Sequence, residues 1–112
     1  MQATSANLAL ACSLSPGEYG HRLREFRRLF AASLREAQRE PTRLRLLLDP
    51  SGAPAAAVGD LLQREQACCP FFTFTVEAMA GAVAVEAAVP EGAEECLDDL
   101  ARLAGRAVAA RA

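Results

Sequence analysis

The sequence predicts a single α+β domain, residues 1–112, with one four-stranded mixed sheet and helices mainly on one face of it. Segments with a two-residue apolar period, typical of strands, alternate with longer segments whose apolar residues recur every three or four positions, typical of helices. Their order is β-α-β-α-β-β-α, with short connections. A chain of 112 residues can bury a core without disulfide bonds. Residues 1–7 and 106–112 are expected to be flexible ends.

The first half of the chain predicts a strand followed by a long helix. In "LALACSL", residues 8–14, every second side chain, Cys12 included, would face the core. Ser15 can cap the next helix, Pro16 suits its first position and Glu18 completes a capping box. An apolar stripe predicts that this helix extends to about residue 39; it consists of Tyr19, Leu23, Phe26, Phe30, Leu34 and Ala37.

The second half predicts a strand, a helix, a hairpin and a last helix. "TRLRLLLD", residues 42–49, alternates as a strand and is followed by turn residues. A helix is expected from Ala55 to Cys68 or Cys69, because Pro70 disfavours helix at the residue before it. "FFTFTVEAM" and "AVAVEAAV" around "AG" predict a β-hairpin. The last helix is expected from about residue 91 to 107, with Leu97, Leu100, Leu103 and Ala104 buried.

Composition excludes several classes of partner. The formal charge is −2, so there is no electrostatic case for nucleic acid. Six arginines between Arg22 and Arg39 are interspersed with glutamates, which predicts a solvated helix face. No segment could span a membrane, and no leader of adequate length precedes Cys12. We therefore expect a cytoplasmic protein whose thiols stay reduced, so that its four cysteines act as ligands, redox groups or core residues.

The face of the predicted sheet away from the helices is unusually bland. It would carry Ala9, Ala11, Arg45, Leu47, Thr73, Thr75, Ala82, Ala84 and Ala88. Such a surface is as consistent with a homodimer interface as with the exposed side of an alanine-rich chain.

The residues that carry chemistry lie in "REQACCPFF", residues 64–72. Cys68 and Cys69 end the predicted helix, and Cys12 would approach them if the first strand packs beneath that helix. Adjacent cysteines do not match C-x-x-C spacing, and the chain has one histidine, so a tetrahedral zinc site and a thioredoxin-like site are poorly supported. Two or three thiolates suit a soft ion such as Cu(I), Hg(II) or trivalent arsenic.

Helix polarity and a neighbouring carboxylate bear on the same site. The C-terminal end of a helix disfavours a thiolate and favours a cation, which favours metal binding over redox catalysis. Glu65 lies on the apolar face one turn earlier, as a ligand, an acceptor behind the ligands or a base for a thiol proton; alternatively, it reaches solvent or pairs with an arginine. Cys96 is expected in the core or as a further ligand, and His21 on the surface.

With these residues, the chain resembles a family of small bacterial proteins marked by E-x-x-C-C-P-F-x-x-F. The matching positions are Glu65, Cys68, Cys69, Pro70, Phe71 and Phe74, and Cys12 matches an upstream cysteine. The resemblance extends from about residue 8 to 105. It implies a role in heavy-metal handling, such as mercury resistance.

These observations predict a cytoplasmic protein that binds a soft metal ion as a scavenger, chaperone or sensor accessory. Cys12, Cys68 and Cys69 would be the ligands, supported by Glu65. One alternative is a thiol oxidoreductase or reductase that uses the Cys68–Cys69 pair. Another is a dimeric interaction module whose cysteines only pack.

Overall fold

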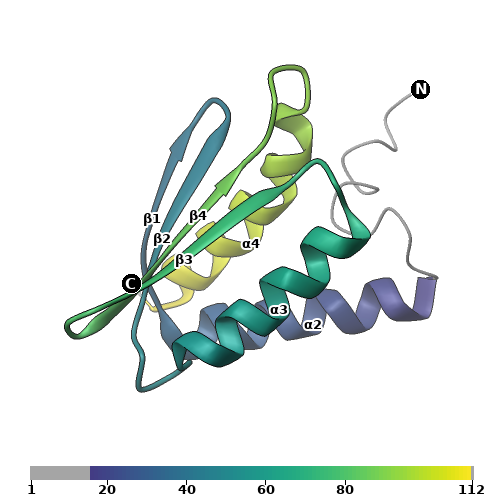
Figure 1. Ribbon diagram of the computed structural model, residues 1–112. Coiled ribbons are helices and arrows are strands. Elements are labelled where there is room, and N and C mark those ends of the chain that lie inside the picture. The colour runs from purple at the N-terminus through teal and green to yellow at the C-terminus, as the bar shows by residue number, and fades with distance from the viewer. Residues whose placement is uncertain (1–15, 112) are drawn as a thin grey trace.

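The computed structural model describes residues 16–111 and has three helices and four strands in that range (Figure 1). The elements are α2 (Pro16–Ser33), β1 (Leu34–Glu40), β2 (Arg43–Leu48), α3 (Ala55–Cys68), β3 (Thr73–Met79), β4 (Ala82–Ala88) and α4 (Glu94–Arg111). The α+β class is therefore confirmed, and α3 and the β3–β4 hairpin lie where the sequence predicts them. None of the three described helices combines the length and hydropathy that crossing a bilayer requires. The expected first strand, residues 8–14, lies outside the described residues.

The sheet is antiparallel throughout, and the expectation of a mixed sheet is wrong. Its strand order is β1-β2-β4-β3, and each neighbouring pair is antiparallel. A helical connection between consecutive strands, as in the expected β-α-β order, is typical of parallel pairs. Here the sheet is built from two hairpins instead, and a short connection between adjacent strands requires them to run in opposite directions.

The expected helix from residue 16 to about residue 39 ends early, because residues 34–40 form β1. Beyond Ser33 the predicted stripe contains one large apolar residue, Leu34, so a longer helix would gain little from packing. As a strand, the same segment pairs with β2 from Leu34↔Leu48 to Glu40↔Arg43. The backbone groups along that side of β2 are thereby hydrogen-bonded. Strand pairing outweighs the helical period here.

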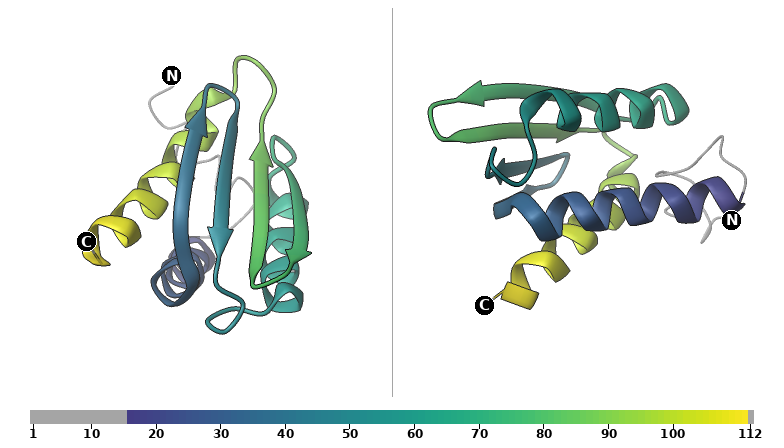
Figure 2. Two further views of the ribbon diagram at one scale, coloured as in Figure 1. Left: turned by 90° about the vertical axis from the view of Figure 1, so that its left-hand side faces the viewer. Right: turned by 90° about the horizontal axis from the view of Figure 1, so that it is seen from below.

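All three described helices lie on one face of the sheet, as Figures 1 and 2 show. Most of the side chains that the strand periods predict to face inward are buried there, among them Leu44, Leu46, Leu48, Val83, Val85 and Phe72. Phe74 and Val76, which are also predicted to face inward, are partly buried. The residues predicted to be buried in the last helix, Leu97, Leu100, Leu103 and Ala104, are buried as well. Phe26 and Phe30 of α2 contact each other with ring centroids 5.9 Å apart. One continuous core thus joins the helices to the sheet.

The other face of the sheet is more polar than the sequence analysis expected. A hollow of about 290 Å³ lies on it, and its lining includes Glu36, Arg45, Glu77 and Glu86. Glu36 belongs to β1, which was expected to be helical. Charged side chains therefore interrupt the apolar residues of this face.

The turn after β2 packs tightly against the junction between α2 and β1. The amide of Asp49 donates to the carbonyl of Ser33 at 2.6 Å, and the amide of Gly52 donates to the carbonyl of Asp49 at 3.0 Å. A Cβ atom at Gly52 would collide with the carbonyl oxygen of Ala32. The turn therefore requires glycine at this position.

Replacing Gly52 with alanine is expected to lower the free energy of unfolding by roughly 1–3 kcal/mol, because backbone must move to relieve the collision. The matched control is Gly59→Ala within α3, where no atom lies within 4 Å of the new Cβ; it should raise stability by about 1 kcal/mol through helix propensity. Urea denaturation measures both changes. Equal stability of the two variants would contradict the close approach at Gly52.

Candidate thiol site

The C-terminal end of α3 places the two adjacent cysteines in different surroundings. Cys68 is the last helical residue, and the amide of Cys69 donates to the carbonyl of Glu65 at 2.8 Å. Cys69 then leaves the helix with extended backbone angles, as expected for a residue before proline. Its side chain is fully buried in the core, whereas that of Cys68 is half-buried. The pair thus presents one thiol to the core and one nearer the surface.

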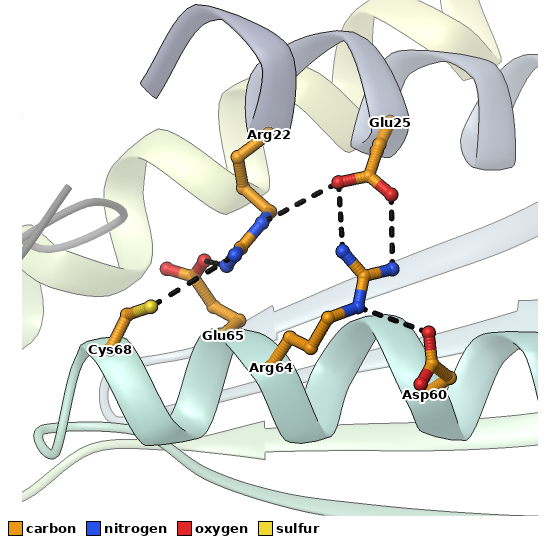
Figure 3. Close-up of polar contacts among 6 residues, drawn as sticks. All are labelled: Arg22, Glu25, Asp60, Arg64, Glu65 and Cys68. Carbon is orange, nitrogen blue, oxygen red and sulfur yellow. Dashed lines mark hydrogen bonds and ion pairs between the residues drawn. The ribbon is translucent and has the colours of Figure 1, made fainter. Parts of the chain in front are cut away.

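One turn before Cys68, the carboxylate of Glu65 is buried in an ion pair with an arginine of α2 (Figure 3). Nη1 of Arg22 donates to Oε1 of Glu65 at 2.6 Å, and the Glu65 side chain is 0% exposed. The Arg22 side chain is 10% exposed. Oε2 of Glu65 is buried and has no hydrogen-bond partner among the described residues. The carboxylate therefore keeps one oxygen available for a ligand or a proton.

Burial dominates the ionisation of Glu65. It raises the pKa of the carboxyl from its ordinary value of 4.5 to about 7, although the hydrogen bond and charge of Arg22 act in the opposite direction. Removing a carboxylate from water costs more than one cationic partner restores. Near neutral pH, Glu65 is consequently close to its titration midpoint.

Arg22 also contacts the Cys68 thiol, and so links both motif residues. Nη2 lies 3.9 Å from Sγ of Cys68 and donates to it, while Nη1 of the same guanidinium holds Glu65. The donors of a guanidinium have a fixed fork geometry. The ion pair with Glu65 therefore also sets the position of positive charge beside the sulfur.

A second set of ion pairs orients the guanidinium of Arg22 from its other side. Nε of Arg22 lies 3.5 Å from Oε1 of Glu25. Both oxygens of Glu25 accept hydrogen bonds from Arg64 at 3.0 Å, and Nε of Arg64 donates to Asp60 at 3.0 Å (Figure 3). The hydrogen bond from Arg64 lowers the pKa of Glu25, and Glu25 in turn raises the pKa of Arg64. These ion pairs limit the directions that Arg22 can take.

Of the other residues that the sequence analysis singles out, the structure describes Cys96 and His21 but not Cys12. Cys12 lies outside the described residues, so its distance from Cys68 and Cys69 stays a prediction. Cys96 is buried in the core and His21 is exposed, as expected. Within residues 16–111, no group of three or more His, Cys, Asp and Glu side chains is arranged to hold a metal ion. A site with three thiol ligands therefore requires Cys12.

Sequence reasoning missed Arg22, although the signal that identified Glu65 was present there too. Arg22 precedes Phe26 by four residues and therefore falls on the apolar stripe of its helix. When two helices each carry one charged residue on their apolar face, and the two charges are opposite, a buried ion pair is expected. The glutamates interspersed among the six arginines of residues 22–39 predict a solvated helix face and conceal the buried Arg22.

Comparisons with protein-family models, curated proteins and solved structures found no match.

Stability is expected to fall as pH rises from about 4.5 to about 7, because folded protein retains the proton on Glu65 over a range in which the unfolded chain has lost it. The raised pKa corresponds to roughly 3 kcal/mol of unfolding free energy. This contribution is fully present below the unfolded pKa and is lost above the folded one. Urea denaturation from pH 4.5 to 8 measures it as the difference between wild type and Glu65→Gln, which should level off above pH 7. A pH-independent difference would refute the assignment.

Removing the cation should expose the cost of the buried carboxylate. Arg22→Met is expected to lower the unfolding free energy at pH 8 by roughly 3–5 kcal/mol, because Glu65 is left charged or must bind a proton. Adding Glu65→Gln to this variant should recover part of the loss. A surface control is Arg43→Met, which breaks only an exposed pair with Glu86 and should cost less than about 1 kcal/mol. Similar losses in the two arginine variants would contradict a buried pair.

Proposed function

We propose that this protein binds a soft, thiophilic metal ion through Cys68, Cys69 and Cys12, with Arg22 and Glu65 completing the site. The observation that carries the proposal is the position of Arg22, which contacts both Glu65 and the sulfur of Cys68. The resemblance to small bacterial proteins of heavy-metal handling supports the same function. The ion is cargo, of the Cu(I) or Hg(II) type, and the protein acts as scavenger, chaperone or sensor accessory.

Charge balance supports this class of ion. Two thiolates around Cu(I), or three around Hg(II), form a complex with one net negative charge. A buried anionic complex needs a counter-charge, and Arg22 provides one beside Cys68. The last carbonyls of α3 also favour positive charge where the two cysteines lie. The cation itself suits the carbonyl end of the helix, and Arg22 compensates the excess negative charge of the thiolates.

Glu65 supports the ligands from behind. Its Oε1 holds Arg22 in place, and its buried Oε2 lacks a hydrogen-bond partner among the described residues. Binding requires the thiols to lose their protons. The carboxylate lies one helical turn from Cys68, where it can take up such a proton or contact the bound ion.

The redox alternative draws on the same arginine, because a guanidinium beside a sulfur also favours the thiolate that thiol–disulfide exchange requires. In that reaction one cysteine attacks a disulfide, the released thiol leaves, and the second cysteine resolves the mixed disulfide. Such an enzyme would turn over with a thiol reductant, and added metal would inhibit it.

Anaerobic titration of the reduced protein with Hg(II), or with Cu(I) in competition with a chromophoric chelator, tests metal binding. Glu65→Gln is expected to weaken metal affinity about 10- to 100-fold, as is typical when a residue that supports the ligands without binding the metal is lost. Loss of a ligand should exceed roughly 100-fold, as expected for Cys68→Ser and for Cys69→Ala. Alanine suits position 69, because the Cys69 side chain is 0% exposed.

The matched control is Cys96→Ala, a buried cysteine of α4, which should leave affinity unchanged and cost only packing energy. Wild-type affinity should weaken as pH falls, since protons compete with the ion for the thiolates. Binding by wild type no tighter than by Cys68→Ser would refute the proposal. Turnover of a disulfide substrate that depends on one cysteine and is inhibited by metal would support the redox alternative.

A further inference from the structure

Among the described strands, β3 forms one outer edge of the sheet, and the side of it that faces away from β4 is suited to pairing with another strand. The amide of Phe74 donates to Oε1 of Gln66 at 3.0 Å, so it points away from β4. Antiparallel pairing alternates, and the register of β3 with β4 has no bulge. The backbone groups of Val76 and Ala78 therefore point outward too. Proline and bulges, which protect many edge strands, are absent from Thr73–Met79, and Glu77 is its one charged residue.

Exposed apolar side chains lie at both ends of this edge strand. Three large hydrophobic side chains among the described residues are more than one-third exposed, namely Phe71 at 49%, Met79 at 52% and Val108 at 37%. Met79 ends β3, and Phe71 precedes the strand by two residues. Met79 has the sequence parity of Thr75 and therefore belongs to the side of the sheet without helices, whereas Phe71 lies in the turn before the strand. Leaving two such residues in water beside an unprotected edge is unfavourable.

We propose that β3 pairs with β3 of a second copy of this chain, antiparallel about a two-fold axis through Thr75. A two-fold axis uses the same patch on both copies. Phe74 then lies opposite Val76 of the partner subunit, whose carbonyl replaces Oε1 of Gln66 as the acceptor for the Phe74 amide. Phe71 lies at the level of Met79 of the partner subunit, and the symmetric contact forms at the other end. The two sheets become one sheet of eight strands.

The helix beside this edge leaves room for the second copy. A hollow of about 480 Å³ lies between α3 and β3, and Ala56, Gly59, Gln63, Gln66, Phe74 and Val76 are among its lining residues. The α3 side chains that line this hollow are uncharged except for Asp60, which is paired with Arg64. No atom lies within 4 Å of a Cβ built at Gly59. Two α3 helices can therefore approach across the new junction, and each Asp60 has Arg64 as its partner.

The open face of the sheet is the other candidate for a homodimer interface, and it carries more charge than the β3 edge. The hollow on that face is lined by Glu36, Glu77 and Glu86, with Arg45 as its one basic side chain. Stacking two copies there would bring carboxylates together and remove them from water, which costs free energy. Strand pairing places Thr73 opposite Glu77 of the partner subunit and avoids this. The observations therefore favour a second copy at the β3 edge.

Sedimentation velocity of the full chain under reducing conditions, over a range of protein concentrations, tests the proposal. Wild type is expected to approach twice the 11.9 kDa of one chain. Met79→Glu should raise the dimer dissociation constant roughly tenfold or more, because it replaces an apolar contact at each end of the paired strands with charge. The control is Val108→Glu, the same kind of change at the exposed apolar residue of α4, which should leave the dimer intact. Circular dichroism checks that each variant folds.

Two further variants decide between surfaces. Gly59→Lys fits the open space of one copy but blocks the approach of two α3 helices, so it should also give monomer. Leu47→Glu alters the open face of the sheet and should not change the dimer. Wild type that stays monomeric at every concentration would overturn the proposal. So would a dimer that Leu47→Glu dissociates and that Met79→Glu and Gly59→Lys leave intact.

Discussion

The buried ion pair between Arg22 and Glu65 is the constraint on which the arrangement of this site depends. The pair joins α2 to α3. Arg22 of α2 contacts Glu65 of α3, and Arg64 of α3 contacts Glu25 of α2 (Figure 3). A buried pair of charges is tolerated only if its geometry is well satisfied, because each ion has lost its water. Arg22 meets this condition by contacting Glu65, Glu25 and Cys68 together, whereas Oε2 of Glu65 has no hydrogen-bond partner among the described residues. The position of the thiol end of α3 relative to α2 follows from these contacts.

The helix stop at Pro70 gives the two neighbouring thiols different surroundings. A helix that continued would carry both cysteines around its surface at successive positions. Because the chain leaves the helix at Cys69, this side chain enters the core while Cys68 stays beside Arg22. The same stop directs the chain into Phe72 and Phe74, whose rings stack with centroids 5.0 Å apart. One proline therefore organises both the site and the start of β3.

Much of this structure could be predicted because its local signals agree with its packing. Helix α3, with its proline stop, and the hairpin around Gly81, whose φ is 74°, have strong local signals, and both lie where expected. Residues 34–40 could not be predicted, since their helical period is weak and the partner that makes them a strand, β2, follows later in the chain. The Arg22–Glu65 pair was accessible in part: each charge stands out on its own helix, but only the packing of α2 and α3 pairs them. The place of Cys12 in the site remains a prediction.

The direct passage from α2 into β1 has a consequence for how this chain can change in length. No connecting residue separates Ser33 from Leu34, and the Asp49 amide holds the junction from the side. An inserted residue before Ser33 would rotate the first part of α2 by about 100° and carry Arg22 away from Glu65. An inserted residue after it would move Leu34 out of the core and reverse the faces of β1. The spacing between Arg22 and Leu34 is thus shared by the site and the sheet, and insertions or deletions should be confined to other parts of the chain.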